Sequence, residues 1–156
     1  MDSDSACSLF AGPLGSFTDS PMFLWLSLGA ILGALFIRFA RSRSPDGQLR
    51  FFAVGLVVAA VIYVGFALAD GVEWIALEAA GVVLFVLLAY AGVRHSPLLL
   101  ALGWTVHVGW DVGLHLARQQ VVVPAWYPSA CISFDLLVAG YVVWTVWATQ
   151  QQQEAA

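Results

Sequence analysis

Five long apolar runs constrain the fold of this sequence more than any other feature. They cover residues 22–39, 51–69, 74–91, 97–116 and 129–148. Each run approaches or reaches the roughly 20 helical residues that cross the hydrocarbon core of a membrane. With 61% hydrophobic and only 10% charged residues, the composition is not that of an ordinary soluble domain. The sequence therefore predicts an all-α integral membrane protein, a bundle of five transmembrane helices.

The five runs belong to one predicted domain, residues 21–148. Residues 1–20 are acidic and small and are predicted to be an exposed tail, and the glutamine-rich residues 149–156 a disordered one. Arginines crowd around a predicted Pro45-Asp46-Gly47 turn, which places this loop in the cytoplasm by the positive-inside rule. Five spans then put the N-terminus outside and the C-terminus inside, with only Arg118 among the arginines outside. We expect a multi-pass membrane protein, located in the cell membrane if the source is a prokaryote.

The fourth run carries three ionisable side chains, His107, Asp111 and His115, at a spacing of four residues. On an α-helix that turns about 100° per residue, they fall within an arc of roughly 80°. An imidazole or carboxylate exposed to hydrocarbon costs several kcal/mol. The stripe is therefore predicted to face protein partners, water or a metal ion rather than lipid.

Two further carboxylates lie at comparable depths on neighbouring spans, Glu78 on the third and Asp135 on the fifth. At about 1.5 Å per residue, His107 and Asp135 lie deepest, roughly 10–15 Å below the outer surface. Glu78 and Asp111 lie less deep, and His115 lies near the surface. Three helices thus deliver ionisable groups to the same half of the membrane, which predicts a polar site in the outer half of the bundle.

Imidazoles and carboxylates together suit zinc, iron or manganese, and no other cofactor is predicted. The predicted metal ligands are His107, His115 and Asp135. The predicted catalytic residues are Asp111, Glu78 and Asp135, as ligands, ligand partners or general bases. On a straight helix His107 and His115 are about 12 Å apart, too far to share one ion readily. Two metals, or a metal and a separate acid/base group, are therefore the alternatives.

Three functions are compatible with such a site. The favoured hypothesis is an intramembrane hydrolase, oxidase or cyclase for a lipid-like or terpenoid substrate, using a metal or a protonated Asp135 or Glu78. A proton- or ion-coupled transporter or channel subunit is the alternative. That hypothesis requires a homo-oligomer, because five spans are few and no ionisable residue lies between His107 and the cytoplasmic arginines.

A non-catalytic scaffold is the third hypothesis. In it, the ionisable residues pair with each other or with tryptophan and tyrosine and only fix helix packing. The predicted surroundings are the lipid bilayer in every case. Nucleic-acid binding is excluded by the net charge of −4 and the lack of a basic patch.

The polar positions also carry a resemblance. Together they resemble the motif of a family of small multi-span integral membrane proteins of unknown function, which implies a membrane protein but no particular activity. The motif consists of Glu78 upstream, then His107-x-x-Trp110-Asp111-x-x-x-His115 and Pro124-x-Trp126-Tyr127-Pro128-x-x-Cys131-x-x-x-Asp135. A weaker similarity is to intramembrane zinc hydrolases of the alkaline ceramidase type. This sequence departs from those in having five predicted spans rather than seven and no His-x3-His pair.

Overall fold

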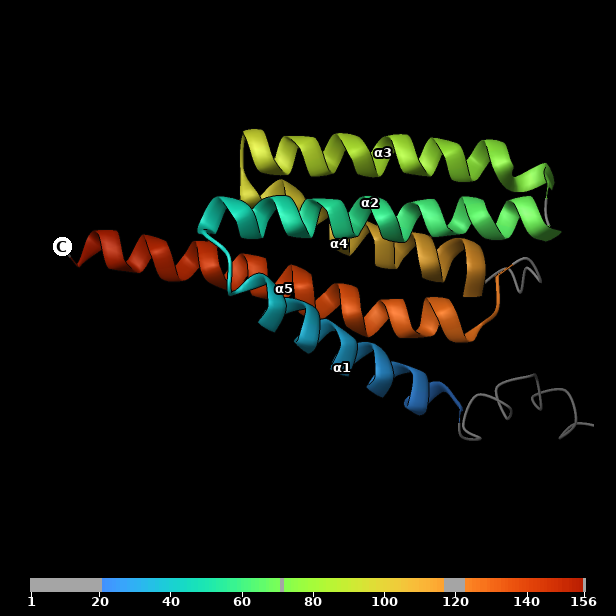
Figure 1. The fold of residues 1–156 in the computed structure, drawn as a ribbon, viewed down its shortest axis with the longest axis horizontal. Helices are drawn as coiled ribbons and strands as arrows, with labels where there is room; N and C mark the ends of the chain where they lie inside the picture. The colour runs from blue at the N-terminus through green and yellow to red at the C-terminus, as the bar shows by residue number, and fades with distance from the viewer. Residues whose placement is uncertain (1–20, 71, 117–122, 156) are drawn as a thin grey trace, which may run out of the picture.

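The computed structural model describes residues 21–70, 72–116 and 123–155. Almost all of these residues are helical, and none of them forms a strand. The helices run roughly along one axis and alternate in direction, as Figure 1 shows. In chain order they are α1 (Pro21–Ala40), α2 (Pro45–Asp70), η2 (Val72–Trp74), α3 (Ile75–Arg94), α4 (Pro97–Trp110), η3 (Asp111–Leu116) and α5 (Trp126–Glu154).

The all-helical prediction is confirmed, and each predicted run lies within a helical segment. Within the described residues, four helical segments are long and apolar enough to cross a membrane: Met22–Ala40, Pro45–Ala69, Val72–Arg94 and Trp126–Glu154. Helix α4 has only 14 residues, but the π-helix η3 continues it directly. Together they cover Pro97–Leu116, the same stretch as the fourth predicted run.

Helices α2 and α4 begin alike, each with a proline behind a serine that accepts a backbone hydrogen bond, and the start of α2 corrects the sequence prediction. The predicted turn at residues 45–47 is instead the first turn of α2, so the connection from α1 is shorter. The backbone N–H of Gly47 donates to Ser44 Oγ (3.3 Å), and that of Leu98 donates to Ser96 Oγ in the same way at α4 (3.3 Å). Proline suits the first helical position because its missing N–H would have no helical partner there.

The C-terminal end also differs from the prediction. Residues 149–154 were expected to be disordered, but they are the last turns of α5, which ends at Glu154. Glutamine is a good helix former, so this exposed stretch continues a helix that the preceding apolar residues have already nucleated. The predicted N-terminal tail (1–20), Arg118 and residue 156 lie outside the described residues.

The helices surround a core to which α1 contributes little. Helix α1 packs along α5, α5 packs on α4, and α3 lies between α4 and α2. The buried side chains come mainly from the four later helices, and they include Phe52, Leu56, Phe85, Leu100 and Trp104. Helix α1 touches α2 only slightly, so the ring of helices is loosely closed on that side.

Two glycines of α1 allow its close approach to α5. A Cβ atom on Gly29 would overlap the carbonyl oxygen of Ala130, and one on Gly33 would lie 3.2 Å from Phe134 Cα. Next to this contact, the hydroxyl of Ser133 donates to the Leu26 carbonyl (2.6 Å). The attachment of α1 to α5 therefore includes close backbone contact at these two glycines.

We predict that Gly29→Ala lowers the free energy of unfolding by about 1–3 kcal/mol, because its methyl group has no space against α5. Gly140→Ala is the matched control, since no described atom lies within 4 Å of its Cβ position and alanine is the better helix former. Denaturant unfolding in detergent micelles measures both variants. Equal stability of the two variants would contradict this account of the α1–α5 contact.

Candidate functional site

Among the described residues, five acidic and histidine side chains are buried inside the bundle near the end where α3 begins and α4 ends. All of them were singled out from the sequence, and none is more than 6% exposed. They come from α3, α4, η3 and α5, and they are Glu78, His107, Asp111, His115 and Asp135. Buried ionisable groups need partners, because each loses its hydration on folding.

Three of these residues form a compact group, which we call the triad: His107, Asp111 and Asp135. Each offers one ligand atom, and these atoms all lie within 4.8 Å of one another. His107 Nδ1 lies 2.7 Å from Asp135 Oδ2 and 3.7 Å from Asp111 Oδ2. One imidazole nitrogen thus faces two carboxylates, one from its own helix and one from α5.

The remaining two ionisable residues form a separate pair beside the triad. His115 Nε2 lies 3.4 Å from Glu78 Oε1, and the indole N–H of Trp110 donates to Glu78 Oε2 (3.1 Å). His115 is not a member of the triad. Of the three predicted metal ligands, the structure brings His107 and Asp135 together, and Asp111 rather than His115 is the third group beside them.

The predicted stripe divides at the point where the helix type changes. The backbone N–H of Asp111 bonds to the carbonyls of both His107 and Val108, and from Asp111 onward the segment is a π-helix. A π-helix has more residues per turn than an α-helix, so the direction of His115 relative to Asp111 differs from the one expected on a straight α-helix. His107 and Asp111 consequently face Asp135, while His115 faces Glu78 on α3.

Tyr63 of α2 connects the two groups, and the sequence analysis missed it. Its hydroxyl donates to Asp111 Oδ1, and its ring stacks on that of His115 with centroids 4.3 Å apart. The side chain is only 1% exposed. A tyrosine in the middle of an apolar run was the available signal, because a buried hydroxyl needs an acceptor.

Several polar atoms of the site retain unused binding capacity. Within the part of the chain that the structure describes, His107 Nε2, Asp111 Oδ2 and Asp135 Oδ1 are buried and have no hydrogen-bond partner. Buried polar atoms without partners are rare in native proteins and are costly. The triad can therefore accept a further positively charged or hydrogen-bonding ligand.

The site is closed on one side and adjoins a cavity on another. Toward the arginine-rich end, the bundle is filled by apolar side chains such as Leu56, Leu100 and Trp104. On the side of the site that faces α1, a cavity of about 290 Å³ lies between α1, α2 and α5, and we call it the lateral cavity. Its walls are mostly apolar, and Asp135 and Cys131 contribute to them. Cys131 thus borders open space.

Comparison with known families places the chain in one of them. A family model described as "Family of unknown function (DUF6010)" matches residues 26–149, which include every residue of the site. The chain belongs to the DUF6010 family. No curated protein and no solved structure matches the chain. DUF6010 membership agrees with the expected resemblance to a family of unknown function and leaves the activity to be argued from the site.

We predict that Tyr63→Phe lowers the stability of this DUF6010 protein by about 1–3 kcal/mol, because a buried Asp111 oxygen loses its donor. The phenylalanine ring keeps the stacking on His115. Tyr90→Phe is the control, since Tyr90 is 62% exposed. Unfolding in detergent measures both, and an unchanged stability in Tyr63→Phe would show that the hydroxyl does not support the site.

Proposed function

We propose that this chain is a multi-pass membrane protein with five spans, an outer N-terminus and an intramembrane enzyme site in its outer half. The triad would hold a divalent metal ion. The observation that carries the proposal is the convergence of His107, Asp111 and Asp135, all fully buried, with ligand atoms within 4.8 Å of one another.

Charge balance favours a divalent cation at the triad. Two ionised carboxylates in an apolar bundle would repel each other and pay a large desolvation cost. A divalent cation neutralises both, while His107 supplies a neutral nitrogen ligand. The set of one imidazole and two carboxylates suits zinc, iron or manganese. Three protein ligands also leave a coordination position open, as catalytic rather than structural sites do.

The neighbouring residues have complementary tasks in this proposal. A bound metal would act as a Lewis acid and supply an ionised water as nucleophile. Tyr63 fixes the orientation of Asp111 by donating to its second oxygen. The pair His115 and Glu78 would accept and return protons next to the triad, because an imidazole beside a carboxylate suits general acid/base catalysis.

The lateral cavity favours a lipid-like substrate. Its wall includes Leu28, Leu32 and Ile62, and both leucines and the isoleucine are also partly exposed on the outside of the bundle. An apolar chain could enter from the bilayer between α1 and α2 without crossing water. Its polar group would meet Asp135 at the inner wall of the cavity. Metal-assisted hydrolysis of a lipid ester or amide is the reaction class that fits these parts best.

A proton or ion pathway through one copy of the chain has less support. Such pathways use ionisable side chains that follow one another across the bundle. Below His107, the described core consists of apolar side chains, including Phe52 and Val142. The buried ionisable groups of the described residues are thus confined to one end, which is the arrangement of an enclosed site.

We predict that the purified wild-type protein contains about one equivalent of zinc, iron or manganese per chain. His107→Ala, Asp111→Asn and Asp135→Asn each lose most of it, because each removes one of three ligands. His115→Ala and the control His95→Ala retain it, since neither histidine belongs to the triad. Elemental mass spectrometry on detergent-purified, folded protein measures the content.

A metal-free wild type after purification without chelators and reconstitution with each ion would overturn the metal site. Loss of metal in His115→Ala with retention in Asp111→Asn would instead return the ligand set to the one predicted from sequence. Circular dichroism measures the helix content of each variant separately, so loss of the metal ion is distinguished from loss of the fold.

We predict that a fatty acid carrying a photoreactive diazirine labels α5 at residues 126–135 in proteoliposomes, because this segment lines the lateral cavity. Ala59→Phe should reduce labelling several-fold by filling the cavity from α2, with metal content unchanged. Ala76→Phe, an exposed alanine on α3, is the control for general effects of an added ring. Peptide mass spectrometry locates the label, and equal labelling in both variants would exclude the cavity as the access route.

A further inference from the structure

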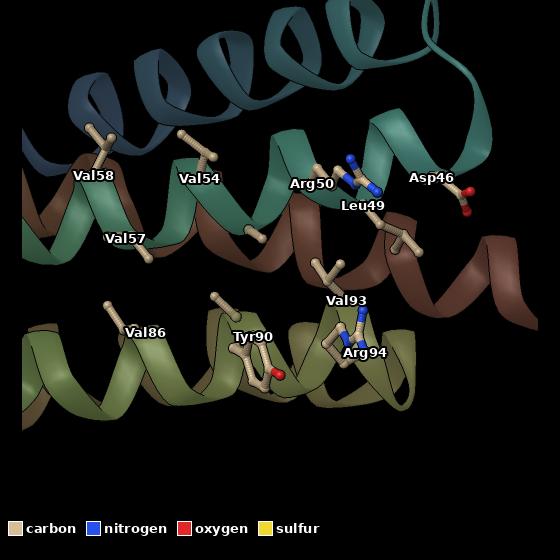
Figure 2. A pocket seen from close by; sticks show the side chains of 12 residues that line it. Asp46, Leu49, Arg50, Val54, Val57, Val58, Val86, Tyr90, Val93 and Arg94 are labelled. Atoms are coloured by element: carbon tan, nitrogen blue, oxygen red, sulfur yellow. The ribbon is translucent and has the colours of Figure 1, made fainter.

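A second hollow lies at the opposite end of the bundle from the triad, and we call it the α2–α3 groove. Figure 2 shows it between these two helices, with aliphatic side chains along its length. Its volume is about 730 Å³, larger than the lateral cavity. Small residues form part of its wall, Ala53 on α2 and Ala89 on α3, which keeps the space between the helices open.

One end of the groove is cationic. Arg50 of α2 and Arg94 at the end of α3 line the same end from opposite walls, as the labelled sticks in Figure 2 show. Asp46 is the single acidic residue of the lining, so the three charges sum to a net positive charge. Among the described residues, no acidic side chain forms a salt bridge with either arginine. Both guanidinium groups are exposed and available to an anion.

The other end of the groove is apolar. It continues past Val54 and Val57 to Val58 on α2, facing Val86 on α3. From Arg50 to Val58 the helix rises about 12 Å, a distance that takes the groove well into the hydrocarbon region. Val54 and Val58 are each more than half exposed, so the groove opens toward the surrounding bilayer.

We propose that the α2–α3 groove binds an anionic glycerophospholipid of the cytoplasmic leaflet. The lipid phosphate lies between Arg50 and Arg94, and one acyl chain follows the valines toward the bilayer centre. Charge complementarity favours this ligand. The two guanidinium groups match the anionic headgroup, and the apolar channel next to them matches an acyl chain. The orientation agrees with the positive-inside rule, which places this end in the cytoplasm.

This inference does not depend on the enzymatic proposal. It requires only that α2 and α3 cross a membrane, and both are long and apolar enough to do so. The groove and the triad share no residue. An anionic lipid bound there would hold α2 against α3 at the end of the bundle where their packing leaves a gap.

The test measures lipid binding to the full detergent-purified chain by native mass spectrometry. Phosphatidylglycerol, phosphatidylcholine and inorganic phosphate are titrated separately. We expect phosphatidylglycerol to bind at least several-fold more tightly than phosphatidylcholine, and Arg50→Gln/Arg94→Gln to weaken it about tenfold or more. The control Arg38→Gln/Arg41→Gln removes the same charge from the same side but outside the groove, and it should leave binding unchanged.

A second variant tests the apolar part of the groove without altering charge. Val86→Phe narrows the channel beside Val58 and should also weaken phosphatidylglycerol binding, with the affinity for phosphatidylcholine already low. Equal losses in both arginine pairs would mean that general attraction to the cationic side suffices, and this would overturn the proposal. Full competition by inorganic phosphate, or no effect of Val86→Phe, would equally overturn a lipid site.

Discussion

The contact between His107 and Asp135 joins α4 to α5 at a depth where neither side chain reaches water, and the rest of the site is arranged around it. With 2.7 Å between nitrogen and oxygen, the two groups satisfy one another only partly. Asp111 approaches the same imidazole, and Tyr63 of α2 holds Asp111 from the other side. Breaking any member leaves a buried polar group without a partner, which costs far more than the contact itself contributes. Helices α2, α4 and α5 are therefore locked in register by polar contacts inside an otherwise apolar bundle.

The two ends of the bundle differ in kind. The buried acids and imidazoles gather at one end, and the arginines and the α2–α3 groove lie at the other. Between them, a core of aromatic and aliphatic side chains separates the two polar regions. Because helices in a bilayer gain little from hydrophobic association with one another, such polar contacts and close backbone packing carry much of the specificity of assembly. The triad is an example of such polar contacts, and the contact of Gly29 with α5 is an example of close backbone packing.

The sequence was sufficient to predict the helical architecture and the meeting of His107 with Asp135, because apolar run length and depth along a helix follow directly from residue positions. It was not sufficient to predict that His115 would turn toward Glu78, since a switch to π-helical winding depends on packing that no local pattern reveals. Tyr63 escaped notice because a tyrosine in an apolar run is ordinary until its acceptor is known. The start of α2 was misplaced because Pro45 and Gly47 fit a turn as well as they fit a first helical turn behind Ser44.

The loose edge between α1 and α2 has a mechanical consequence. Helix α1 packs mainly along α5, with Phe36 also in contact with Phe51 and Phe52 of α2, and it forms one wall of the lateral cavity. The other cavity walls belong to helices held in place by the core. The side of the cavity between α1 and α2 therefore lies at the most weakly packed edge of the ring. In the proposed enzyme, this edge would border the entrance for the substrate, so the composition of the surrounding membrane would bear on access to the triad.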